Sequence, residues 1–346
     1  MKHGNRYGLH RVIEPQGTMP QPAWRIDNTM ELYSNEILID VETLNIDSAS
    51  FTQIREVEGG DPVKVGEHMK RIVAERGKHH NPVTGSGGML IGTVKSIGEA
   101  LQGRIDLSAG DRIATLVSLS LTPLTIDEIV RMDVKTGQVD IKGQAILFES
   151  GLYAKLPSDI PDRIALAVLD VCGAPAQTAK LVQPGDTVVV LGAGGKSGSM
   201  VLCQARKSAG SEGNIIAIEY GEAGCEMIRA TGWADVVLNL DATKPVDVLA
   251  AVDKVTGGRG ADVTINCVNI PGTEMASILS TRDEGTVYFF SMATSFTAAA
   301  LGAEGVGKDV NMIIGNGYTK GHADLSLNLV RESAELRDLF AQKYSH

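Results

Sequence analysis

A glycine-rich segment that follows a strand-like run is the part of this sequence best suited to bind a phosphate group. The run Thr187–Leu191 is apolar, Gly192-Ala-Gly-Gly-Lys-Ser-Gly198 follows it, and the next residues have apolar side chains at helical spacing. Strand, tight turn and helix together form the context of a dinucleotide-binding fingerprint, because the N–H groups and the positive end of the helix face a pyrophosphate. The segment is not a perfect G-x-G-x-x-G, since Ser197 holds the third glycine position and Gly198 follows it.

An acidic residue at the end of the next strand predicts which dinucleotide binds. Ile215–Ile218 is a second apolar run, and it ends in Glu219. A carboxylate here can accept hydrogen bonds from both hydroxyls of the adenosine ribose, and it repels a 2′-phosphate. The sequence therefore favours NAD over NADP, and a glycine turn that binds nothing is the alternative.

Residues at the ends of later strands complete the predicted cofactor site, because cofactor and substrate bind at the carboxyl ends of parallel strands. Within the glycine segment, Lys196 could pair with the cofactor or face solvent, and Ser197 could bond a phosphate oxygen or cap the helix. The predicted cofactor-binding residues are Gly192, Gly194, Gly195, Lys196, Ser197, Glu219, Asn266, Val268, Ser291 and Met292.

The composition limits the class of protein. The chain has 346 residues, enough for two domains, and it is 43% hydrophobic and 21% charged with 39 glycines, as expected of a globular α/β protein. Its formal charge of −10 argues against nucleic acid or an anionic membrane as a partner. The cysteines show no C-x-x-C spacing and no apolar run is long enough to span a membrane, so we expect a cytoplasmic protein with free thiols.

The elements that must position these residues alternate between strand and helix from Pro184 onward, which predicts a doubly wound α/β domain. The predicted strands are Thr187–Leu191, Ile215–Glu219, Val236–Asn239, Val263–Asn266, Thr286–Phe290 and Met312–Ile314. The predicted helices between them include Ser199–Ala209, Ala223–Thr231, Val246–Val255 and Thr273–Leu279.

The N-terminal half has the pattern of a mostly β domain with few helices. Glu36–Leu44 alternates apolar and polar residues, as a half-buried strand does. Met89–Gly98 and Arg112–Val117 are further predicted strands, with Gly110 and Asp111 in the turn between them. A predicted helix over Arg163–Thr178 joins the two halves.

Motifs along nearly the whole chain resemble the medium-chain dehydrogenase/reductase superfamily. They are Glu42–Asp47, the Gly92 to Gly98 strand, Ala109–Ile113, the helix before Val182–Asp186, the Gly192 segment and Met312–Lys320. The resemblance implies a GroES-like, mostly β catalytic domain at 1–163 and 318–346. It also implies a Rossmann domain at 164–317 that binds the cofactor.

The set of zinc ligands of this superfamily is incomplete in the sequence. Zinc-dependent alcohol dehydrogenases hold the catalytic metal with two cysteines and a histidine. Here the first cysteine position falls at Asp47, the histidine position falls at Gly88 or near Ser86, and only Cys172 stands where the last ligand would be. One cysteine cannot hold zinc, so we expect no metal.

More narrowly, the chain is similar to the L-erythro-3,5-diaminohexanoate dehydrogenase family. The similar segments are Gly8–Pro15, Asn45–Phe51, Asn81–Gly88 and Gly192–Gly198. The resemblance implies an NAD-dependent homodimer that oxidatively deaminates L-erythro-3,5-diaminohexanoate to 5-amino-3-oxohexanoate, with release of ammonia, in lysine fermentation. Two other functions stay open. One is a zinc-free quinone or enoyl-thioester reductase, which usually prefers NADPH, and the other is an inactive NAD-sensing regulatory protein.

Oxidation of an amine needs a base and not a metal, because the amine must lose a proton before hydride leaves the neighbouring carbon. Asp47 is the first candidate for the general base, since it replaces a metal ligand, and a helix cap is its alternative role. Ser86 could contact substrate or belong to an ordinary glycine loop. Cys172 could touch substrate or nicotinamide, or fill a packing position. His79 and His80, with Arg76 and Lys78 before them, could hold the substrate carboxylate or lie on the surface.

Overall fold

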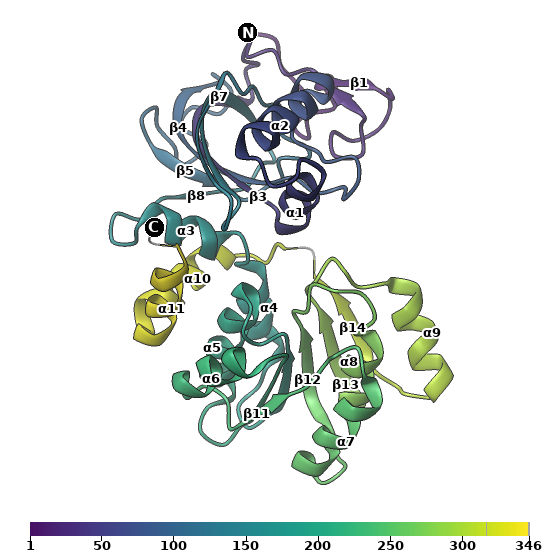
Figure 1. The fold of residues 1–346 in the computed structure, drawn as a ribbon. Helices are drawn as coiled ribbons and strands as arrows, with labels where there is room; N and C mark the ends of the chain where they lie inside the picture. The colour runs from purple at the N-terminus through teal and green to yellow at the C-terminus, as the bar shows by residue number, and fades with distance from the viewer. Residues whose placement is uncertain (316, 345–346) are drawn as a thin grey trace. The chain divides into compact units, whose positions relative to one another are not determined.

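Short apolar strands that alternate with helices form one parallel sheet in the second half of the chain, because such strands are buried on both faces. The structure is a computed structural model, and it describes residues 1–315 and 317–344. The chain divides into two compact units, Met1–Asp170 and Val171–His346, and each is described by itself (Figure 1).

The second unit is a doubly wound α/β unit, as predicted. Its elements are α4 (Gly173–Leu181), β9 (Thr187–Leu191), α5 (Lys196–Ala209), β10 (Asn214–Glu219), α6 (Glu222–Thr231), β11 (Val236–Asn239), α7 (Pro245–Thr256), β12 (Ala261–Asn266), α8 (Glu274–Ser280), β13 (Thr281–Phe289), α9 (Phe296–Val306), β14 (Asn311–Ile314), α10 (His322–Glu332) and α11 (Ala334–Tyr344). The six strands are parallel, in the order β11-β10-β9-β12-β13-β14. The direction of winding reverses between β9 and β12, and ligands bind at this switch point in such sheets.

The first unit is built around an antiparallel sheet, also as predicted. Its elements are a short 3-10 helix (Leu9–Arg11), β1 (Val12–Glu14), β2 (Arg25–Ile26), β3 (Glu36–Ile46), α1 (Ser48–Val57), α2 (Pro62–Arg76), β4 (Gly88–Ile97), β5 (Arg112–Thr115), β6 (Glu128–Asp133), β7 (Gln138–Phe148), β8 (Tyr153–Lys155) and α3 (Asp162–Leu169). The main sheet has the order β6-β7-β3-β4-β5-β8, with β1 and β2 paired separately. The long strand β3 lies between β7 and β4, and its carboxyl end leads directly into α1.

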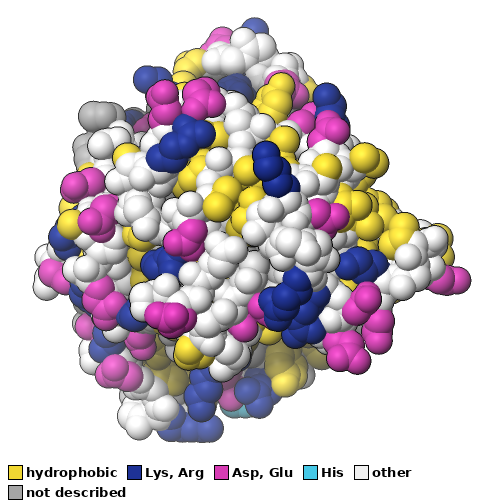
Figure 2. Space-filling view, turned by 90° about the horizontal axis from the view of Figure 1, so that it is seen from below, with side chains coloured by type: hydrophobic (Ala, Val, Ile, Leu, Met, Phe, Trp, Pro, Cys, Tyr) yellow, Lys and Arg dark blue, Asp and Glu magenta, His cyan; other side chains and the backbone are white. Residues whose placement is uncertain are grey.

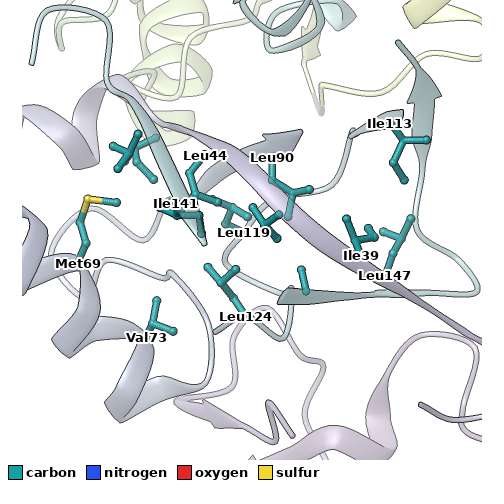
Figure 3. Close-up of a cluster of buried hydrophobic side chains, with 14 of the residues drawn as sticks. Ile39, Leu44, Met69, Val73, Leu90, Ile113, Leu119, Leu124, Ile141 and Leu147 are labelled. Atoms are coloured by element: carbon teal, nitrogen blue, oxygen red, sulfur yellow. The ribbon is translucent and has the colours of Figure 1, made fainter. Parts of the chain in front are cut away.

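The core of the first unit lies between this sheet and helix α2. Figure 3 shows Met69 and Val73 of α2 beside the apolar side chains of the sheet, among them Leu44 and Ile141. Local signals set the ends of α2, because Asp61 caps its first turn and Gly77 ends it in the left-handed region at φ 71°. The helix is therefore fixed at both ends while one face packs on the sheet.

The structure differs from the expected elements in several places. The helix expected over 163–178 is two helices, α3 and α4, which are interrupted at residues 170–172. The sequence analysis did not predict β1, β2, β6, β7, β8, α2, α9 and α11. Helices α10 and α11 pack against α4 and α5 of the second unit, whereas the sequence assigned 318–346 to the β domain. Those domain boundaries stay a prediction, and Asn316 in the Met312–Lys320 motif lies outside the described residues.

A buried ion pair holds the N-terminal segment to β3. Arg11 is fully buried and Glu36 is 1% exposed, with Arg11 Nε 2.6 Å from Glu36 Oε1 and Arg11 Nη2 2.7 Å from Oε2. The remaining N–H groups of Arg11 donate to the carbonyl oxygens of Thr29 and Glu31. Burial alone would raise the pKa of Glu36, but hydrogen bonds from Arg11 and His10 outweigh it and lower the pKa from 4.5 to about 2.

We predict that Arg11→Met destabilises the first unit by about 3–5 kcal/mol, because it leaves the Glu36 carboxylate buried without a partner. Urea unfolding followed by circular dichroism measures this change. Since the pKa of Glu36 is lowered on folding, the contribution of Glu36 to stability is present above pH 4.5 and is lost as the pH falls towards 2.

Arg112→Met is the control for Arg11→Met, because Arg112 pairs with Glu42 and Asp162 on the surface. Loss of these surface pairs should cost about 1 kcal/mol of stability or less. Equal losses in the two variants would contradict the prediction.

Candidate functional site

The turn between β9 and α5 brings strand and helix unusually close. Gly192 has φ 72°, in the left-handed region, and α5 begins at Lys196 with Gly195 as its N-cap. A Cβ atom added to Gly198 would overlap the carbonyl oxygen of Gly192. Gly198 therefore has the structural role of the third glycine of the fingerprint, one residue later than the standard spacing. Because its side chain is only a hydrogen atom, α5 can begin in contact with the end of the strand.

Glu219 and the glycine loop are joined by a hydrogen bond. The N–H of Gly194 donates to Glu219 Oε2 at 2.6 Å, so the carboxylate at the end of β10 lies over the second glycine of the loop. Gly224 also approaches this side chain closely, since a Cβ there would lie 2.8 Å from Glu219 Cγ. The two features that the sequence analysis treated separately thus form one local structure.

Ser197 is the second residue of α5, so the alternative that it caps the helix is wrong. Its hydroxyl forms a hydrogen bond with the thiol of Cys267, which lowers the pKa of this thiol. Burial has the larger effect and raises the pKa of Cys267 to about 12. Lys196 is half-buried in the first turn of α5. The structure places both residues at the helix N-terminus where a phosphate would bind.

The carboxyl ends of β12 and β13 meet the glycine loop. Val268 lies directly beside Gly192, and its N–H donates to Asn266 Oδ1 at 3.0 Å. The Asn266 amide also donates to Thr273 and Ser277, so this buried side chain fixes the loop from inside the protein. The N–H of Ser291 lies 3.4 Å from the carbonyl oxygen of Asn266. The structure therefore brings Asn266, Val268 and Ser291 to one edge of the sheet, next to the glycine loop.

The side chains at this edge of the sheet differ in their exposure to solvent. Met292, which follows Ser291, is 74% exposed. The Ser291 hydroxyl accepts from the N–H of Ala293 and shapes the loop after β13. The side-chain amide of Asn266 already donates to groups within the protein. A hydrogen bond to the cofactor would therefore come from residues near Asn266 and not from this amide. The cofactor-binding role of these residues stays a prediction.

Asp47 and Ser86 come together in the first unit. Asp47 directly follows β3 as the N-cap of α1, and its Oδ1 accepts from the N–H of Ala49 at 3.0 Å, so the predicted cap is confirmed. The N–H of Asp47 donates to the carbonyl oxygen of Gly87, one residue after Ser86. The Ser86 hydroxyl lies 2.7 Å from Ser50 Oγ and 3.1 Å from Thr84 Oγ1. The sequence analysis did not single out Ser50 and Thr84, because isolated hydroxyl residues give no signal of spatial proximity.

Cys172 belongs to the second unit and is 2% exposed. It is the residue before α4, and its carbonyl oxygen accepts from the hydroxyl of Ser326 in α10. This packing position agrees with the structural alternative for Cys172, and its catalytic role stays a prediction.

Arg76, Lys78 and His79 are buried, so the expectation that this basic segment lies on the surface is wrong, whereas binding of the substrate carboxylate stays a prediction. Arg76 packs over the ring of Trp24, and the fully buried Lys78 donates to the carbonyl oxygens of Pro20 and Gln21 at 2.6 and 2.7 Å. Burial lowers the pKa of Lys78 to about 7 and that of His79 to about 4. Backbone hydrogen bonds at Gly87 and at His79 itself oppose this effect of burial on His79 without outweighing it.

The side chains of the described residues 1–315 and 317–344 include no group of three or more His, Cys, Asp and Glu that is placed to hold a metal ion. The expectation that the chain needs no metal stays a prediction.

Two family models match the chain. One is described as the N-terminal domain of L-erythro-3,5-diaminohexanoate dehydrogenase and matches residues 10–157. The other is described as a zinc-binding dehydrogenase and matches residues 198–314. The first covers the segment that contains Asp47 and Ser86, and the second begins at Gly198.

Two curated relatives are similar to the chain over nearly its full length. The chain is 59% identical over 341 residues to the L-erythro-3,5-diaminohexanoate dehydrogenase of Acetoanaerobium sticklandii, with 99% of each chain covered. It is 57% identical over 344 residues to the enzyme of the same name from Fusobacterium nucleatum subsp. nucleatum, which covers 99% of this chain and 100% of the relative.

Solved structures share the fold at low identity. A mycobacterial protein complexed with NADPH is 18% identical with a TM-score of 0.59, covering 92% of each chain. An alcohol dehydrogenase from Thermus sp. ATN1 is 18% identical with a TM-score of 0.56, covering 91% of this chain and 87% of that one. These likenesses confirm the predicted fold class, a doubly wound α/β unit together with a mostly β unit.

We predict that Gly198→Ala weakens NADH binding by about tenfold or more, because the added methyl group drives α5 away from Gly192, at a cost of about 1–3 kcal/mol in stability. Titration of NADH fluorescence measures the affinity, and thermal unfolding measures the stability. Gly305→Ala is the control, since a Cβ on this residue of α9 meets nothing within 4 Å. It should gain up to about 1 kcal/mol in stability and bind NADH as before. Unchanged affinity in Gly198→Ala would refute the role given to this glycine.

Proposed function

Because this chain belongs to the L-erythro-3,5-diaminohexanoate dehydrogenase family, we propose that it oxidatively deaminates L-erythro-3,5-diaminohexanoate with NAD. The products are 5-amino-3-oxohexanoate, ammonia and NADH, and the reaction serves lysine degradation. The observation that carries this proposal is identity well above half over nearly the whole chain to two dehydrogenases of that name. The chain is accordingly an oxidoreductase, and neither the quinone or enoyl reductase nor the inactive sensor is favoured.

The residues of the second unit fit a nicotinamide dinucleotide. Gly192 and Gly198 have no side chains, and α5 therefore begins directly against the end of β9. No side chain of these two residues covers the helix N-terminus, so its N–H groups can face a pyrophosphate. Gly194, Gly195, Lys196 and Ser197 would contact the phosphates, and when bound the cofactor supplies the hydride acceptor of the reaction. The preference for NAD is our inference from Glu219, whose carboxylate would pair with ribose hydroxyls and repel a 2′-phosphate.

Asp47 is our candidate for the general base. The ammonium at C3 of the substrate must lose a proton so that its lone pair can assist the departure of hydride from C3. A carboxylate pairs with the ammonium, takes its proton and releases that proton to solvent. The regenerated carboxylate then removes a proton from the water that attacks the imine, and it returns this proton to the nitrogen that leaves as ammonia. Asp47 lies at the end of a core strand, where the backbone on both sides is held, so its position is defined before substrate arrives.

Ser86 and Cys172 have smaller roles in this proposal. The Ser86 hydroxyl stands in the loop that hydrogen-bonds the backbone of Asp47 through Gly87, and we assign it a contact with substrate. Cys172 is almost fully buried, so we assign it a close-packed position directly before α4.

The second unit also supports a homodimer. Strand β14 is the last strand of its sheet, and Ile314 on it is 60% exposed. Helix α9 adds Phe296 and Leu301, which are 71% and 62% exposed. Figure 2 shows hydrophobic side chains gathered towards its right-hand edge, the side on which Figure 1 draws α9. We propose that a second copy covers this surface with its own β14, and sedimentation velocity measures the resulting mass.

We also propose a cytoplasmic location, because Cys172, Cys203, Cys225 and Cys267 are all free and buried thiols. No single helix of the described ranges is long and apolar enough to cross a membrane, and α3 and α4 would reach that length only together.

We predict that the purified protein forms NADH and ammonia in equal amounts from NAD and L-erythro-3,5-diaminohexanoate, with and without a chelator. Asp47→Asn should lower kcat about a hundredfold or more, because asparagine can still cap α1 but cannot accept the proton. NADH absorbance and an ammonia assay measure both products.

The matched control for this variant is Asp61→Asn. Asp61 caps α2 in the same way, through the N–H of Val63, and is not part of the proposed site. Its variant should keep wild-type turnover. Hydride transfer near the wild-type rate in Asp47→Asn would remove Asp47 from the catalytic role, whereas lack of NADH formation by the wild type would overturn the proposed function itself.

We predict that Glu219→Gln weakens NAD binding and narrows the preference for NAD over NADP by about tenfold, because the amide neither repels a phosphate nor accepts two hydrogen bonds as strongly. The ratio of kcat/KM for the two cofactors measures this preference. Glu226→Gln, on the exposed side of α6, is the control and should leave the ratio unchanged. A wild-type ratio in Glu219→Gln would exclude the ribose assignment.

A further inference from the structure

Three hydroxyl groups form a closed ring beside Asp47 in the first unit. Ser50 Oγ lies 2.6 Å from Thr84 Oγ1 and 2.7 Å from Ser86 Oγ, and the last two oxygens are 3.1 Å apart. Ser50 lies in the first turn of α1 and is fully buried, whereas Thr84 and Ser86 are half-buried in the loop before β4. The ring is therefore anchored in the protein on one side and accessible on the other.

The number of protons in the ring decides what kind of group it can bind. Three hydroxyls carry three protons and six lone pairs, and a ring of three hydrogen bonds uses three of each. No proton is left to donate, while three lone pairs remain, one of which meets the N–H of Ser86 at 3.4 Å. If Ser50 instead donates to the carbonyl oxygen of Ser86, 3.2 Å away, the ring keeps one more lone pair. In either arrangement the ring accepts hydrogen bonds, which suits an ammonium and not a carboxylate.

The loop that carries Thr84 and Ser86 is fixed by Asn81, which is 1% exposed. Asn81 Oδ1 accepts from the N–H of Val83, its amide donates to Gln53, and its backbone N–H donates to the carbonyl oxygen of Ser86. These contacts hold the loop on α1 in the absence of any ligand. The ring is consequently preorganised, so little ordering entropy is lost when a ligand binds.

The charges around the ring also favour a cation. Asp47 caps the helical turn that contains Ser50, and its full negative charge exceeds the partial positive charge of the helix end. The nearby Lys78 does not offer its ammonium to a ligand at the ring, because it donates to the backbone carbonyl oxygens of Pro20 and Gln21. Burial lowers the pKa of His80 to about 4, with the charges of Lys78 and Arg76 adding to the effect, so His80 is neutral near pH 7.

We propose that the ring of Ser50, Thr84 and Ser86 binds the substrate ammonium that is not oxidised, the one at C5, and so selects a diamine over a monoamine. The proposal rests on the function proposed above and adds a specificity site to it. The ammonium donates into the lone pairs of the ring, while the amine at C3 is left to the general base.

The test compares Thr84→Val, which keeps the shape of the side chain but removes its hydroxyl, with Thr84→Ser, which keeps the hydroxyl. Ser48→Ala is the control, because Ser48 is an exposed residue of the same helical turn outside the ring. Each variant is assayed with 3,5-diaminohexanoate, with 3-aminohexanoate, which lacks the amine at C5, and with hexane-2,4-diamine, which lacks the carboxylate. If 3-aminohexanoate is turned over too slowly to measure, its inhibition constant replaces its KM.

We expect Thr84→Val to raise KM for 3,5-diaminohexanoate and for hexane-2,4-diamine by about tenfold, with constants for 3-aminohexanoate within about twofold of wild type. Thr84→Ser and Ser48→Ala should resemble wild type. Equal losses with all three compounds, or no loss with any, would overturn the proposal. A loss confined to compounds with a carboxylate would show that the ring binds that group. Wild-type NADH formation from 3,5-diaminohexanoate establishes the proposed function independently of these ratios.

Discussion

The second unit of this protein depends on a steric constraint, the close approach of α5 to the end of β9. Only hydrogen atoms at Gly192 and Gly198 allow the helix to begin so near the strand. The same approach brings the N–H of Gly194 within reach of Glu219, and it brings Val268 beside the turn. Residues from β9, β10 and β12 thereby meet at the switch point of the sheet, where their arrangement follows from the spacing of glycines and not from direct contacts among reactive side chains.

In the first unit, charged groups are used inside the protein to fix backbone segments. Arg11 and Lys78 donate to backbone carbonyl oxygens, and Arg11 also neutralises Glu36. Each of these groups donates to carbonyl oxygens of a stretch without regular secondary structure, where hydrophobic contacts alone would leave buried carbonyl groups unsatisfied. The consequence for the site is that Asp47 and the hydroxyl ring are surrounded by backbone whose position is already set, although the loop itself consists largely of small residues.

The sequence predicts the parallel strands well, because strands buried on both faces are apolar along their whole length. It fails for α9, whose alanines, glycines and exposed Phe296 and Leu301 give no amphipathic stripe. The glycine fingerprint identifies the loop but misplaces its third glycine, since the spacing alone does not show which residue faces Gly192. The burial of Arg76 and Lys78 cannot be predicted, because their partners are carbonyl groups and an aromatic ring more than fifty positions earlier. For Asp47, the sequence leaves two roles open, and a helix cap and a general base are compatible.

The distribution of cysteines has a practical consequence for spectroscopy. All four are buried thiols, and all four lie in the second unit, so residues 1–170 contain none. A cysteine introduced at an exposed position of the first unit would therefore be the most accessible thiol of the native protein, and a maleimide dye or a spin label would attach there in preference to the natural cysteines. The wild-type chain can serve as the parent for labelling without prior removal of its own thiols.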